Sequence, residues 1–149
     1  MNINLEQTIL RNLLTNEPYM RKVLPFIKPD YFEGIYRILF NEAGKFVGKY
    51  NKLPTAESFK IEVDQSDRLN GENYTVAVDI IPQLFAKEEI DEKWLLDTTE
   101  KWCQDRALYN AVMESISIID GKHTKLTKNR TKFCISFLMD FNIKLFLFP

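Results

Sequence analysis

The sequence is poor in the residues that build metal centres and disulfide frameworks. Its 149 residues include two cysteines, one histidine and five glycines. This set does not supply the three or four ligands of a protein metal site, and secreted disulfide scaffolds normally have more cysteines. We therefore expect Cys103 to be a small buried apolar residue, His123 to be solvated, and the protein to work in a reducing cytoplasm.

The chain also lacks an excess of charge of either sign. It has 20 basic and 21 acidic residues, for a net charge of -1. Proteins that bind DNA directly usually carry a basic excess, because neutralising phosphates supplies much of the affinity. We therefore expect at most indirect contact with DNA. The candidate phosphate contacts lie in the basic segment 122–132 and are Lys122, Lys125, Lys128 and Arg130. An ordinary polar loop is the alternative interpretation of this segment.

No catalytic or cofactor-binding residue is expected from the sequence. Gly121 and Lys122 resemble the end of a phosphate-binding loop, but Ile116 stands where such a loop needs its first glycine. Acidic pairs such as Glu88 and Glu89 are typical of solvated faces. The apolar segment 133–149 is short for a membrane span and contains charged residues, so no membrane role is expected.

The sequence pattern predicts an all-α fold. Apolar residues recur at three- and four-residue spacings, and sustained alternation typical of strands is absent. The expected helices cover residues 5–15, 17–24, 31–50, 56–63, 72–86 and 92–120. Asp30, Thr55 and Asp91 are the expected N-caps of three of them. In the fifth helix, Tyr74 is expected to face the core.

The last of these helices is longer than a small globule can cover. Leu95, Trp102, Tyr109 and Ile116 recur every seven residues along it. Such a repeat predicts packing against a second helix, which is either a return helix of the same chain or another subunit. Core packing is the alternative for the tryptophans. The candidate residues for an oligomer or partner interface are Leu95, Trp102, Tyr109, Val112, Met113 and Ile116.

Several dispersed positions resemble the N-terminal domain of DnaB-type replicative helicases. The opening LEQTILRNLL is similar to the EQ-x-x-L start of that domain. The family's pattern continues with Asp30-Tyr31-Phe32 before IYRILF and with Pro54-Thr55 before a short helix. The segment WLLDTTEKWCQDRALYNAVMESISIID, with Gln104 and Arg106, looks like the corresponding helix of the T-even-type phage helicases.

The resemblance implies a six-helix globular head followed by a long helical hairpin, of which residues 91–121 would form the first arm. It implies that the chain self-associates, as a dimer or as a hexameric ring, and forms the collar of that ring. It also implies that the collar docks primase or a helicase loader. ATP and Mg²⁺ would belong to a separate motor domain, so this chain alone is not expected to be an enzyme. If a phage encodes the chain, we expect it to work in the host cytoplasm.

The resemblance ends near residue 128. The expected organisation is a head over 1–90, a hairpin helix over 91–121, and a connector with an apolar tail over 122–149. The tail departs from the family pattern and no Walker A motif is present, so a truncated, split or frameshifted gene is expected. Two further interpretations stay open: a stand-alone regulator of helicase assembly, and an unrelated helical DNA-binding protein.

Overall fold

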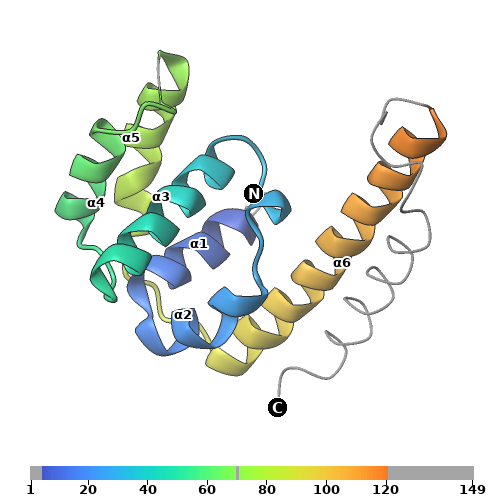
Figure 1. Cartoon of the computed structure of the whole chain (residues 1–149). Helices are drawn as coiled ribbons and strands as arrows, with labels where there is room; N and C mark the ends of the chain where they lie inside the picture. Colours follow the sequence, from blue (N-terminus) through green and yellow to red (C-terminus); the bar gives the residue numbers. More distant parts are fainter. Residues whose placement is uncertain (1–4, 70, 121–149) are drawn as a thin grey trace. The chain divides into compact units, whose positions relative to one another are not determined.

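The computed structural model describes residues 5–69 and 71–120, and within these ranges the regular structure is helical, with no strand. The predicted all-α fold is therefore confirmed. The chain divides into two units with the boundary after Leu96. The elements are α1 (Leu5–Thr15), α2 (Glu17–Val23), the 3-10 turns η1 (Leu24–Phe26) and η2 (Pro29–Tyr31), α3 (Gly34–Tyr50), α4 (Ala56–Asp64), α5 (Glu72–Leu84) and α6 (Glu92–Ile119). Figure 1 labels the six α-helices.

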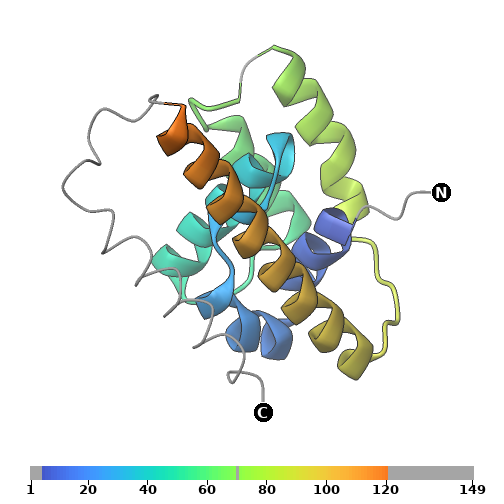
Figure 2. The ribbon, with the colours of Figure 1, turned by 90° about the vertical axis from the view of Figure 1, so that its right-hand side faces the viewer.

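Helix α1 is the centre of the first unit. It packs against α2, α3 and α5, while α4 packs against both α3 and α5 (Figures 1 and 2). The expected apolar positions of α1 supply much of the core, because spacings of three and four residues align on one face of a helix. Four of its side chains are buried: Ile9, Leu10, Leu13 and Leu14.

Local capping explains where two of the short helices begin. The side chain of Asn16 accepts a hydrogen bond from the backbone N–H of Tyr19 at 3.1 Å. Pro18 lies in the first turn of α2, where its missing N–H costs nothing. Thr55 and Ser58 satisfy each other's backbone N–H groups in a capping box at α4. The expected cap at Thr55 is confirmed.

The expected helix over residues 31–50 is shorter at its start, and Asp30 is not its N-cap. Asp30 lies inside η2, Phe32 and Glu33 are extended, and α3 begins at Gly34 with Glu33 at the N-cap. Gly34 has a φ of 50°, a left-handed conformation that glycine tolerates and that interrupts a continuous helix. The separated Phe32 side chain still reaches the core, where it is fully buried.

The expectation that Tyr74 faces the core is also wrong. Its side chain is 37% exposed, and its hydroxyl donates a hydrogen bond to Oδ1 of Asp64 at 2.9 Å. The buried face of α5 consists of Ala77, Ile81 and Leu84 instead. The same three- and four-residue periodicity fits both assignments at the helix start, and the hydrogen bond to α4 favours the outward position.

With α6, the described residues contain six α-helices. Within the described part of residues 1–90, five α-helices and two single 3-10 turns occupy the chain. Pro25 and Pro29 lie in these turns, because proline fixes φ and removes the N–H that a longer helix needs.

Candidate protein interface on helix α6

Asp91 sets the start of α6, as expected from the sequence. Its Oδ1 accepts a hydrogen bond from the backbone N–H of Trp94 at 2.7 Å, which satisfies one of the free donors at the helix start. The helix then continues for 28 residues, a length of about 42 Å at 1.5 Å per residue. The helix is therefore long enough to carry several seven-residue repeats of side chains on one face.

The structure divides the six predicted interface residues into two groups. Leu95 and Trp102 are 2% and 7% exposed. The other four have between 46% and 52% of their surface exposed: Tyr109, Val112, Met113 and Ile116. The seven-residue repeat thus runs from buried positions in the first half of α6 to exposed ones in the second half.

The exposed residues form a continuous apolar surface on the second half of the helix. Leu108 and Ile119 join them, with exposures of 47% and 79%. At 100° per residue, all six side chains fall within an arc of about 140° and along about 16 Å of the helix. We call this surface the α6 apolar stripe: Leu108, Tyr109, Val112, Met113, Ile116 and Ile119.

Two members of the stripe were absent from the interface predicted from the sequence. Ile119 follows Val112 by seven residues, so the repeat itself contained the signal for it. Leu108 falls outside a strict seven-residue repeat but lies four residues before Val112. An α-helix has 3.6 residues per turn, so positions seven residues apart rotate by about 20° around the helix axis. The exposed face therefore also includes the neighbouring position of Leu108.

Polar side chains lie beside the stripe. The guanidinium of Arg106 lies over the ring of Tyr109, with 5.4 Å between its Cζ and the ring centroid. This cation–π contact orients the ring at the stripe's first turn. Lys101 and Asp105 form an ion pair at 3.3 Å on the surface, where such pairs contribute little to stability. The arrangement is an apolar strip with a charged margin, which suits protein–protein contact.

The other predicted contacts are placed differently. Lys122, Lys125, Lys128 and Arg130 lie outside the described residues. Cys103 is buried, as expected. Among the residues that the structure describes, no group of three or more histidine, cysteine, aspartate or glutamate side chains is arranged to hold a metal ion. In the same residues no helix combines the length and the apolar character needed to span a membrane.

Among the described residues, Tyr74 and Lys49 on the surface have raised pKa values. The hydrogen bond to Asp64, with the carboxylate's charge, raises the pKa of Tyr74 above its ordinary value of 10.0. A hydrogen bond to Tyr50 raises the pKa of Lys49 above 10.5. Both shifts hold the proton more tightly at surface sites, so these groups are less suited to proton transfer near neutral pH.

Comparison with known proteins found one similar protein. No family model matches the chain. The chain is nevertheless related to the DnaB-type replicative helicases, which confirms the resemblance seen in the sequence. The relative is the DnaB-like replicative helicase of Enterobacteria phage T4, to which this chain is 30% identical over 113 residues, or 75% of its own length. The chain spans 23% of the length of that helicase.

Proposed function

We propose that this chain is the N-terminal collar and docking domain of a phage-type replicative DNA helicase. The observation that carries the proposal is the similarity over 113 residues to a helicase of which the chain spans 23%. A segment of that size corresponds to one helical domain rather than to a complete motor. The all-α fold of the described residues agrees with the collar domain that the sequence resembles.

In this role the chain self-associates, and the α6 apolar stripe is the contact surface. Contiguous exposed apolar side chains on a helix are stabilised by contact with another apolar face, because contact removes them from water. The seven-residue repeat that ends in Tyr109 and Ile116 suits a facing helix. A second copy of the chain presents the same surface, as ring subunits or a dimer would require.

The same role includes docking of a primase or a helicase loader, and no ATP hydrolysis by this chain on its own. The partner classes follow from the resemblance to the helicase collar. The sequence contains no G-x-x-x-x-G-K-[ST] motif, the loop that cradles nucleotide phosphates in such motors. Nucleotide and Mg²⁺ are therefore assigned to a motor domain, and DNA is contacted only indirectly.

Sedimentation velocity of the full chain over a range of concentrations tests the self-association. The double variant Tyr109→Ser and Ile116→Ser removes two half-exposed apolar side chains from the stripe. We expect a loss of about 2 kcal/mol of association free energy, or roughly a thirtyfold weaker association. Glu114→Ser is the matched control, because Glu114 is exposed on the opposite side of α6.

The outcomes separate the proposal from its competitors. Concentration-dependent dimers or larger species that the double variant loses, with unchanged helicity and an unaffected control, support the collar role. A monomer at all concentrations contradicts it. Steep loss of DNA affinity with added salt would instead favour a direct DNA-binding protein. ATP hydrolysis by the purified chain would contradict the assignment of the motor to another domain.

A further inference from the structure

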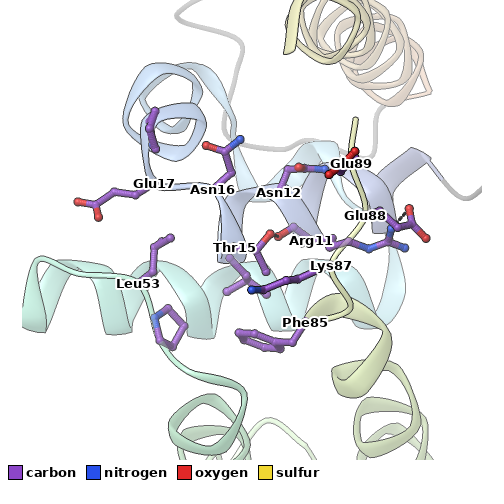
Figure 3. Close-up of a pocket in the computed structure, with 13 residues that line it drawn as sticks. Arg11, Asn12, Thr15, Asn16, Glu17, Leu53, Phe85, Lys87, Glu88 and Glu89 are labelled. Atoms are coloured by element: carbon purple, nitrogen blue, oxygen red, sulfur yellow. Dashed lines mark hydrogen bonds and ion pairs between the residues drawn. The ribbon is translucent and has the colours of Figure 1, made fainter. Parts of the chain in front are cut away.

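An open cleft of about 850 Å³ lies in the first unit, between the end of α1, the start of α2, the residues before α4 and the linker that follows α5 (Figure 3). Two of its acidic side chains already have partners within the chain. Glu88 forms an ion pair with Arg11, which a dashed line marks in Figure 3, and Glu17 is paired with Arg21 at 2.7 Å. A larger group of acidic side chains without such partners lies on α4 and α5.

Residues 57–79, which contain α4 and most of α5, are acidic although the chain as a whole is nearly neutral. They include six acidic and two basic residues, for a net charge of -4, whereas the whole chain has a net charge of -1. Unpaired charges of one sign on a surface attract a partner of the opposite sign. Five of the six acids are exposed and form no ion pair with another described residue: Glu57, Asp64, Asp67, Glu72 and Asp79.

Apolar surface lies among these acids, where α4 and α5 pack side by side (Figures 1 and 2). At 100° per residue, Glu57, Ile61 and Asp64 fall within an arc of about 60° on α4, and Ile61 is 52% exposed. The hydroxyl of Tyr74, from α5, donates to Oδ1 of Asp64 at 2.9 Å, which holds the aromatic side chain beside this arc. We call this surface the acidic α4 face: Glu57, Ile61, Asp64 and Tyr74. Its chemistry suits a segment that carries basic side chains around an apolar one.

The chain itself contains a segment of this kind. Residues 122–132 include five basic residues and no acidic one, and Leu126 lies between Lys125 and Lys128. The lysines can pair with the carboxylates of Glu57 and Asp64, while the leucine covers apolar surface between them. The basic segment therefore has a protein surface of opposite charge available to it and does not require DNA as a partner.

We propose that the basic segment 122–132 of one copy binds the acidic α4 face of a second copy. The α6 apolar stripe is the same surface on both partners, so a contact between two stripes closes into a pair. A contact between two different surfaces leaves one of each free, and it therefore joins pairs into larger species that can close as a ring. This contact rests on the proposed self-association through the stripe, because exposed ion pairs are individually weak.

Sedimentation velocity of the full chain tests the contact, because it separates pairs from larger species. One variant reverses the acidic face with Glu57→Lys and Asp64→Lys, and the other reverses the basic segment with Lys125→Glu and Lys128→Glu. Each variant alone brings like charges together, so pairs should persist and their further association should weaken at least roughly tenfold. In an equimolar mixture every contact between the two variants joins opposite charges, and the larger species should return.

Two controls separate the charges of the face from other effects of the substitutions. Tyr74→Phe removes the hydrogen bond that Asp64→Lys also removes, but it changes no charge and should leave the larger species intact. Glu89→Lys with Glu114→Lys makes the same change in net charge at exposed positions outside the face and should also leave them intact. Raising the salt concentration from about 0.1 M to about 1 M should convert larger species into pairs, because salt screens exposed charges, whereas the apolar contact between stripes persists.

The outcomes distinguish this contact from the proposed contact through the stripe. A monomer at all concentrations contradicts both. A parent chain that stops at pairs, or larger species that neither charge reversal reduces, contradicts only the contact through the acidic α4 face. Failure of the mixture to restore larger species also overturns that contact and leaves the stripe untouched.

Cross-linking of the parent chain decides the question if a charge-reversal variant does not fold. A carbodiimide joins carboxylates to lysines that lie in contact, and a mixture of isotope-labelled and unlabelled copies shows whether the two groups come from different copies. We expect mixed-isotope cross-links from Glu57 or Asp64 to Lys125 or Lys128. Cross-links within single copies only, or none between these residues, would overturn the proposal.

Discussion

The carboxylate of Glu42 on α3 accepts a hydrogen bond from the hydroxyl of Ser66 at 3.0 Å. Glu42 is only 5% exposed, and Lys45 supplies the compensating charge at 2.8 Å. A buried carboxylate requires such partners, because its desolvation is costly when it is unpaired. The contact therefore ties the loop after α4 to the middle of α3.

Ser66→Ala should lower the free energy of unfolding by about 1–2 kcal/mol, because it removes a hydrogen bond to a charged, buried acceptor. Urea denaturation followed by circular dichroism measures this change. Ser115→Ala is the control, because the hydroxyl of Ser115 bonds only back to the carbonyl of Ala111 in its own helix. Equal changes in the free energy of unfolding for the two substitutions would show that the contact with Glu42 does not stabilise the fold more than a hydrogen bond within a helix.

Asp91→Ala should loosen the start of α6. The aspartate caps the backbone N–H of Trp94, and loss of an N-cap costs about 1 kcal/mol. Hydrogen exchange at the Trp94 amide should accelerate, whereas Asp91→Asn, which keeps an acceptor oxygen, should change little. Unchanged exchange in Asp91→Ala would mean that other contacts fix the helix start.

Phe32→Ala should be among the most damaging core substitutions. Phe32 is fully buried and stacks on Phe40, with 4.8 Å between the ring centroids. Replacing a buried phenylalanine by alanine costs about 3–5 kcal/mol. Ile61→Ala, on an exposed face of α4, should cost less than about 1 kcal/mol. Thermal denaturation of both variants checks this order, and similar melting temperatures would contradict the burial of Phe32.

The hydroxyl of Tyr74 should titrate at higher pH in the folded protein than in an unfolded peptide. Its pKa is raised in the folded state mainly because the neutral hydroxyl donates to Asp64. The stabilisation is present below the ordinary pKa of 10.0 and is lost as the pH rises through the folded pKa. A spectroscopic titration of tyrosinate, with Tyr74→Phe subtracted from the parent, measures it. A difference curve centred at or below the ordinary value would refute the contact.

Much of the helical organisation could be predicted from local sequence. The start of α4 follows from Thr55 and that of α6 from Asp91, because a capping side chain acts on amides only two or three residues away. The break before α3 could not be predicted in this way. Glu33 has a partner distant in sequence, because its amide donates to the carboxylate of Glu6 on α1. The Arg37 side chain, from the first turns of α3, donates to the carbonyl of Phe32.

The sequence by itself determined the all-α fold, the heptad pattern of α6 and the relationship to replicative helicases. These features depend on the spacing and identity of residues that are close to one another in the chain. The tertiary structure decided which repeat positions are covered: Trp102 is buried and Tyr109 is exposed, although both fit the same repeat. It also brought Arg11 and Glu88 together at one cleft. The burial of a side chain and its pairing depend on neighbours that are distant in sequence, so a local sequence pattern does not predict them.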